Sequence, residues 1–167
     1  MTTKTHHFLP GHLYPKTNQY VVLVIDDMQV NRILLSKVFT NSGYGVAEAD
    51  SAEAAIEMIS AGLIRPDVIV TDVEMPGMDG IALTEMIRTL PGPAGEIPII
   101  VASGNPDSDM EMDAYDAGAD VFLTKPFNLN QLRDEVRDAI KGDNNIRVSV
   151  RRLHGKSDVN RLRTRLS

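Results

Sequence analysis

The sequence predicts an α/β domain built on a doubly wound parallel sheet with helices on both faces. Five short apolar segments rich in β-branched residues recur along the chain, and each is followed by a segment with helical spacing. Strands that alternate with helices in this way form βαβ units, whose strands run parallel. Of the 167 residues, 43% are hydrophobic and 24% are charged, which indicates one compact domain with short extensions.

The five predicted strands are short, aliphatic and evenly distributed. They end at Ile25, Ala49, Thr71, Ala102 and Leu123, and they read YVVLVI, GVAEA, DVIVT, IPIIVA and DVFL. Apolar runs of this length, rich in valine and isoleucine, are typical of strands that are buried on both sides.

Each strand precedes a predicted helix whose apolar residues lie three or four positions apart. The predicted inward faces are Val30, Ile33, Leu34 and Val38; Ala52, Ala55, Ile56 and Ile59; Leu83, Met86, Ile87 and Leu90; and Leu129, Leu132, Val136, Ala139 and Ile140. The fourth helix has the weakest pattern, with only Met110, Ala114 and Ala117 in line.

Helix-capping residues support the same elements. Asp50 with Glu53, and Asn128 with Gln131, have the spacing of a capping box, and Asn105-Pro106 predicts an N-cap followed by proline in the first turn. Glycines are predicted to end four of the helices: Gly43, Gly62, Gly118 and Gly142.

Charge is divided unevenly along the chain. Residues 1–140 hold nine Lys and Arg against 21 Asp and Glu, a net charge of −12, whereas residues 141–167 hold eight against two, a net charge of +6. We therefore predict an N-terminal extension at 1–19, a domain at 20–141 and a basic tail at 142–167. The first residues contain no apolar segment long enough for a signal peptide or a membrane span, so we expect a cytoplasmic protein without membrane insertion.

The composition also excludes several kinds of site. The chain has no cysteine, which excludes disulfides, thiolate metal sites and a cysteine nucleophile. Its four histidines lie near the ends, at His6, His7, His12 and His154, so most histidine-based catalysis is excluded from the middle of the chain.

Charged and polar residues follow four of the predicted strands. Asp26 and Asp27 follow the first, Asp72 the third, Ser103 the fourth and Lys125 the fifth. Because ligands bind at the carboxyl ends of parallel strands, we expect these side chains to meet at one edge of the sheet. Three converging carboxylates repel one another unless a pKa rises or a cation binds, and an oxygen-rich site suits Mg²⁺.

A phosphoryl group fits this predicted site. The Lys125 ammonium, the Ser103 hydroxyl and a metal ion together form a receptor for its three oxygens. A carboxylate in their midst is then the nucleophile that accepts the group, and Asp72 is that carboxylate by position.

Four motifs, VLVIDDMQVNR, VTDVEMPGMDG, VASG and LTKPF, occur in this order and together resemble the response-regulator receiver domain of two-component signalling. The resemblance covers roughly three quarters of the chain. It implies a flavodoxin-like (CheY-like) sheet in the order 2-1-3-4-5. It also implies a phosphorylation-dependent switch, not an enzyme, that accepts its phosphoryl group from a phosphohistidine on a sensor histidine kinase or a histidine phosphotransfer protein.

The resemblance also implies roles for the acidic residues. Asp72 resembles the phosphoacceptor, which is also a metal ligand, and Asp27 resembles a direct Mg²⁺ ligand. Asp26 resembles a carboxylate that acts through metal-bound water. Glu74 resembles the residue whose backbone carbonyl binds the metal. Its acidic side chain is expected to affect the rate at which the acyl phosphate is hydrolysed.

Three further positions carry implied roles. Ser103 resembles the hydroxyl residue that contacts the phosphoryl group and draws the following loop inward, and Lys125 resembles the lysine paired with it. Phe122 occupies the switch position, although it lacks the hydroxyl of the tyrosine often found there. The family usually has a cis peptide at the bond that corresponds to Lys125-Pro126.

The output of such a switch is less defined. We expect protein contacts with an unknown downstream target on the face made by the fourth helix, the fifth strand and the fifth helix, and a homodimer is one form that such contact can take. The tail is too short for a typical winged-helix or catalytic output domain, which favours a stand-alone receiver. It can be a solvated extension, or it can bind the acidic domain, a partner protein or nucleic acid through phosphates.

Two other classes share part of this chemistry. A dehalogenase-like phosphatase also forms an aspartyl phosphate, but its Asp-x-Asp motif follows the first strand, whereas here Asp72-Val73-Glu74 follows the third. A flavodoxin-like electron carrier needs a hydroxyl-rich loop after the first strand, where Asp26-Asp27 would repel a flavin phosphate. The chain also lacks GxGxxG and Walker A motifs.

Overall fold

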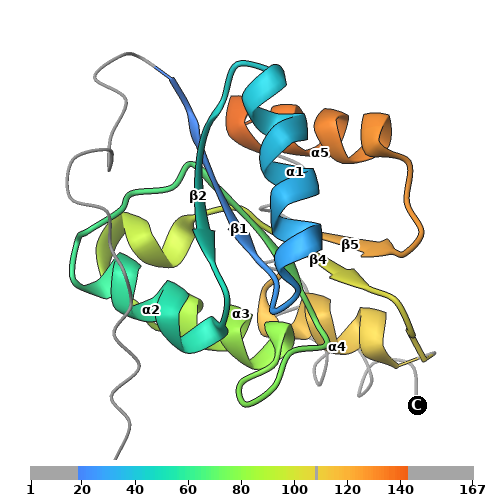
Figure 1. The fold of residues 1–167 in the computed structure, drawn as a ribbon. Helices are drawn as coiled ribbons and strands as arrows, with labels where there is room; N and C mark the ends of the chain where they lie inside the picture. Colours follow the sequence, from blue (N-terminus) through green and yellow to red (C-terminus); the bar gives the residue numbers. More distant parts are fainter. Residues whose placement is uncertain (1–18, 108, 143–167) are drawn as a thin grey trace, which may run out of the picture.

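The computed structural model describes residues 19–107 and 109–142 (Figure 1). All but the first residue of the predicted basic tail, and all but the last residue of the predicted N-terminal extension, lie outside the described residues. In the described part of the chain, none of the helices is both long and apolar enough to cross a membrane.

Five parallel strands form one sheet in the order β2-β1-β3-β4-β5, which confirms the predicted fold class. The strands are β1 (Val21–Ile25), β2 (Gly45–Ala49), β3 (Val68–Asp72), β4 (Ile99–Ser103) and β5 (Val121–Thr124). The last three run one residue beyond their predicted ends. This extension places Asp72 and Ser103 at the last positions of their strands.

Helices cover both faces of the sheet (Figure 1). On one face lie α1 (Gln29–Asn41) and α5 (Leu129–Lys141), and on the other lie α2 (Ala52–Ser60), α3 (Gly80–Arg88) and α4 (Met110–Ala117). A short 3-10 helix, η1 (Gly92–Glu96), joins α3 to β4.

The core has two layers because side chains alternate along each strand. In β1, Leu23 and Ile25 pack with α2 and α3, whereas Val22 and Val24 pack with α1 and α5. Strands that bury both faces are continuous hydrophobic runs, and this explains why their positions could be predicted so closely.

The predicted inward face of α1 is wrong. Leu35 and Phe39 are buried, whereas Val30 is 73% exposed and Ile33 and Leu34 are about half exposed. The helix carries two apolar stripes, and Leu35 and Phe39, four residues apart, form the one that packs on the sheet. Phe39 also makes an edge contact with Tyr44, with ring centroids 6.3 Å apart. The other stripe remains on the surface.

Two predicted helix starts also need correction. Ser51, and not Asp50, caps α2 by accepting a hydrogen bond from the amide of Ala54, while Asp50 accepts one from the Ser51 hydroxyl. Glu53 does not complete a capping box there, since it accepts a hydrogen bond from the distant amide of Met78.

The fourth helix begins later than Asn105-Pro106 predicts. It starts at Met110, and Asp107 accepts hydrogen bonds from the amides of Asp109 and Met110. The amide of Asn105 is engaged by Glu74 and Ser103, so this residue belongs to the loop of the functional site. Asn128 does cap α5 as predicted, and the four predicted glycines follow their helices with positive φ.

We predict that Phe39→Ala lowers the free energy of unfolding by about 3–5 kcal/mol, because it removes a fully buried ring. Ile33→Ala, on the exposed stripe of the same helix, should cost less than about 1 kcal/mol. Urea denaturation of the two variants measures both values. Equal losses would contradict the orientation of α1.

Candidate functional site

The carboxyl ends of β1, β3 and β5 bring three aspartates and one lysine together. The side-chain oxygens of Asp26, Asp27 and Asp72 lie within 4.8 Å of one another. The Lys125 ammonium lies 3.1 Å from Oδ1 of Asp72 and 3.6 Å from Oδ2 of Asp26. Four of the five residues predicted to share an edge of the sheet are therefore neighbours in the structure.

The first turn of α1 holds Asp26 in place. Its Oδ1 accepts a hydrogen bond from the amide of Met28 and its Oδ2 accepts one from the side chain of Asn31. Arg32 donates to the backbone carbonyl of Asp26, at 2.7 Å. Asp26 is thus buried and fixed, whereas Asp27 is exposed, and Arg32 also donates to its backbone carbonyl, at 3.3 Å.

Asp72 sits where α3 approaches β3 most closely. A side-chain carbon at Gly80 would lie only 2.1 Å from the carbonyl oxygen of Asp72, so this contact requires glycine. The hydroxyl of Thr71 also donates to that oxygen. Sequence reasoning missed Gly80, because MPGMDG marks a turn without showing which strand end the turn approaches.

The environment of Asp72 favours its protonated form. Burial raises the pKa of its carboxyl from 3.8 to about 6, and a side-chain interaction with Glu74 raises it as well, while Lys125 acts in the opposite direction. The residue is only 8% exposed. A buried carboxylate with a raised pKa in a charged cluster is typical of functional sites.

The side chain of Glu74 makes contacts that the sequence did not indicate. It accepts hydrogen bonds from the hydroxyl of buried Ser103 and from the amides of Gly104 and Asn105. Burial alone would raise the pKa of Glu74, but hydrogen bonds, above all the one from Ser103, lower it to about 2. Glu74 therefore ties the end of β3 to the loop after β4.

The loop after β5 completes this edge of the sheet. The Lys125-Pro126 peptide bond is cis, in agreement with the expectation from the resemblance. The amide of Lys125 donates to the carbonyl of Ser103 at 2.7 Å, which connects the two loops. Phe122 is partly buried in β5, and its amide donates to the hydroxyl of Tyr115 in α4.

The donor atoms of this site fit a divalent cation. Oδ1 of Asp72 is buried, and the Lys125 ammonium, 3.1 Å away, is its ion-pair partner among the described residues. Three carboxylates converge on the single ammonium of Lys125, so negative charge is in excess within the cluster. Oxygen ligands of this kind suit Mg²⁺, which keeps several waters and binds through one or two carboxylates.

An apolar hollow of about 360 Å³ adjoins the charged cluster. It reaches from the cluster to the exposed stripe of α1 and to the start of α5. Its lining residues are Asp26, Asn31, Leu34, Leu35, Lys125, Pro126, Phe127 and Leu129.

The sheet order and its helices define a CheY-like α/β protein of the flavodoxin-like fold, with an acidic cluster at the carboxyl edge. A family model for the response regulator receiver domain matches residues 22–137. The chain therefore belongs to the receiver domain family of two-component signalling.

Known relatives agree with this assignment. Sporulation initiation phosphotransferase F of Bacillus subtilis (strain 168) is 32% identical over 120 residues, which are 72% of this chain and 90% of that protein. Response regulator MprA of Mycobacterium tuberculosis is 35% identical over 120 residues. This match covers 72% of the chain but only half of MprA.

Solved structures share the same fold. The receiver domain of a signal transduction histidine kinase from Syntrophus aciditrophicus superposes with a TM-score of 0.68 at 29% identity and covers 74% of this chain and 91% of that one. Chemotaxis protein CheY4 of Vibrio cholerae gives a TM-score of 0.65 at 27% identity, covering 72% and 98%. Receiver domains are signalling switches, and the function of this domain is phosphorylation-dependent signalling.

We predict that Asp72→Asn stabilises the metal-free protein at neutral pH. Above pH 6 the native state must hold an ionised, buried carboxylate, so its removal should add roughly 1–3 kcal/mol at pH 7.5, at about 1.4 kcal/mol per pKa unit. The advantage should decrease as the pH falls through 6 and vanish below about 4, where Asp72 is protonated in both native and unfolded states.

Denaturation in EDTA across this pH range measures the difference. Asp113→Asn is the control, because Asp113 is an exposed carboxylate on α4, and its free energy of unfolding should change by less than about 0.5 kcal/mol throughout. A stabilisation by Asp72→Asn that does not depend on pH would contradict the raised pKa.

Proposed function

We propose that Asp72 accepts a phosphoryl group from a phosphohistidine of a sensor histidine kinase or a histidine phosphotransfer protein, with Mg²⁺ bound at the acidic cluster. One observation carries the proposal. Oδ1 of Asp72 is buried, 3.1 Å from the Lys125 ammonium and beside two further carboxylates.

The transfer would be a direct displacement at phosphorus. A carboxylate oxygen of Asp72 forms the new P–O bond while the P–N bond to the donor imidazole breaks and the imidazole leaves with the electron pair. The Lys125 ammonium would pair with a phosphoryl oxygen. Asp27 and Asp72, with the carbonyl of Glu74, would hold Mg²⁺, and Asp26 would act through metal-bound water. The metal would supply positive charge that offsets the charge of the transferring group.

The exposed stripe of α1 supports docking of a donor protein beside the site. Val30, Ile33 and Leu34 are large apolar residues at the surface, and Leu34 also lines the hollow next to Asp26 and Lys125. Exposed apolar groups that gather next to a polar site are typical of protein contact surfaces. A donor bound there would have its histidine close to Asp72.

The position of Ser103 supports a link between phosphorylation and the α4-β5-α5 face. Its hydroxyl now donates to Glu74, so a phosphoryl group that takes this hydroxyl must draw the loop after β4 away from Glu74. That loop leads into α4, which meets Phe122 of β5 through Tyr115. We propose this face as the output surface for a protein target; nucleic-acid binding through residues 142–167 is the alternative output.

We predict that acetyl phosphate with Mg²⁺ adds the mass of one phosphoryl group to the wild-type protein. Asp72→Ala should show no added mass, and EDTA should prevent the addition to the wild type. Intact-mass spectrometry makes the measurement. Asp79→Asn, which changes the capping aspartate of α3, is the control and should still be labelled. Equal labelling of Asp72→Ala would refute the assignment.

We predict that Ile33→Asp slows transfer from a phosphorylated donor protein at least tenfold, because a charge on the exposed stripe opposes an apolar contact worth about 1.4 kcal/mol or more. Labelling by acetyl phosphate should not change, since that donor needs no docking surface.

Leu63→Asp supplies the matched control, because Leu63 is an exposed apolar residue in the turn after α2, away from the cluster. It should leave both reactions at the wild-type rate. If Ile33→Asp slows both donors equally, the chemistry of the site has changed and α1 is not the docking surface.

A further inference from the structure

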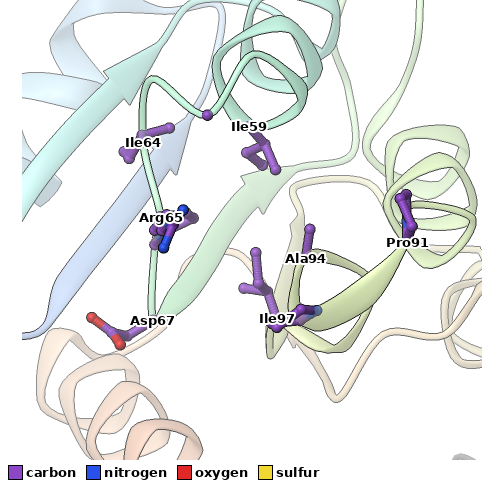
Figure 2. A pocket seen from close by; sticks show the side chains of 10 residues that line it. Ile59, Ile64, Arg65, Asp67, Pro91, Ala94 and Ile97 are labelled. Carbon is purple, nitrogen blue, oxygen red and sulfur yellow. The ribbon is translucent and has the colours of Figure 1, made fainter.

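A groove lies at the end of the sheet opposite Asp72 (Figure 2). It has a volume of about 490 Å³ and is formed by the end of α2, the segment that leads into β3, and η1 with Pro91 just before it. Figure 2 shows Ile59, Ile64, Ala94 and Ile97 around an apolar centre. The groove shares no lining residue with the phosphorylation site, so it is a separate surface.

The chain enters the sheet directly beside this groove. Asp67, which lines the groove, accepts a 2.7 Å hydrogen bond from the amide of Val21 through Oδ2. The amide of Asp67 donates in turn to the carbonyl of Val21, at 2.8 Å. The described part of the chain therefore begins beside the rim of the groove. Six extended residues span up to about 20 Å, so Leu13 and Tyr14 are within reach.

The sequence before β1 suits such a groove. Residues 8–15 read FLPGHLYP, which places four large apolar side chains and two prolines within eight residues. Proline restricts the backbone and so reduces the entropy that binding costs. Residues 1–18 contain two lysines and no acidic residue, whereas residues 20–140 hold seven Lys and Arg against 21 Asp and Glu, a net charge of −14. The charges of segment and domain are complementary.

We propose that residues 8–15 bind in this groove of the same molecule, with Leu13 and Tyr14 as the main apolar contacts. The basic tail is the less suitable occupant. It follows α5, which packs on the other face of the sheet with α1, whereas the groove lies between α2 and η1.

Paramagnetic labelling of the full chain tests the proposal. The protein has no cysteine, so Thr5→Cys introduces a single site to which a spin label can be attached. The amide NMR signals of Gly62, Arg65 and Ala94 should lose at least half their intensity relative to the reduced label. The signal of Gly104, in the loop of the phosphorylation site, should lose far less.

Substitutions in the segment make the test specific. Leu13→Asp with Tyr14→Asp should restore the groove signals, whereas Thr2→Asp with Thr3→Asp adds the same charge outside residues 8–15 and should preserve the loss. Ala94→Asp, in the groove, should also restore the signals of Gly62 and Arg65.

Three results would overturn the proposal. The first is a label that leaves the groove signals intact, and the second is a loss that persists in the Leu13→Asp, Tyr14→Asp variant. The third is a loss of the same size when spin-labelled chains without isotope are mixed with isotope-labelled chains without a spin label, which would place the segment on a second copy. Asp72→Ala should not alter any of these outcomes, so the proposal can fail or succeed independently of phosphorylation.

Discussion

The ion pairs of Lys125 connect the three strands that form the site. Its ammonium is close to Asp72 at the end of β3 and to Asp26 at the end of β1, while Lys125 itself follows β5. Without this positive charge, two buried carboxylates would face each other at the edge of the sheet, and one of them would have to take up a proton. The arrangement of the side chains at the carboxyl ends of the strands therefore depends on Lys125, whose position is set by the loop after β5.

The Lys125 ammonium offsets only part of the negative charge of the three aspartates. The proposed function depends on this excess of negative charge. One ammonium offsets three carboxylates, and burial still raises the pKa of Asp72 to about 6. A site that keeps excess negative charge next to a buried carboxylate suits a cation and, with its help, the phosphoryl transfer proposed above. The same excess lowers the stability of the metal-free domain. Proteins commonly retain destabilising charged groups at functional sites. The two apolar layers of the core stabilise the rest of the fold.

The sequence predicted what depends on local pattern and missed what depends on contacts between distant residues. The strands are continuous apolar runs, so their ends were predicted to within one residue. The prediction of which face of α1 packs inward was wrong because the helix has two apolar stripes. Only the position of the sheet decides that Phe39 packs inward. Asn105 has the local pattern of a helix cap, yet Glu74 engages its amide from 31 residues away. The close approach of Gly80 to Asp72 is likewise invisible in a linear motif.

The burial of Asp72 also gives the exposed apolar stripe of α1 a role in the proposed function. Asp72 is only 8% exposed, so the proposed donor histidine would reach it only when the donor protein is oriented closely against this edge of the sheet. Charge alone attracts a partner without fixing its orientation, and the acidic cluster would repel an approaching phosphoryl group until a cation binds. Apolar residues next to the site supply contact area that does not depend on charge. A small patch such as Val30, Ile33 and Leu34 suits brief contact, which a switch that must release its donor requires.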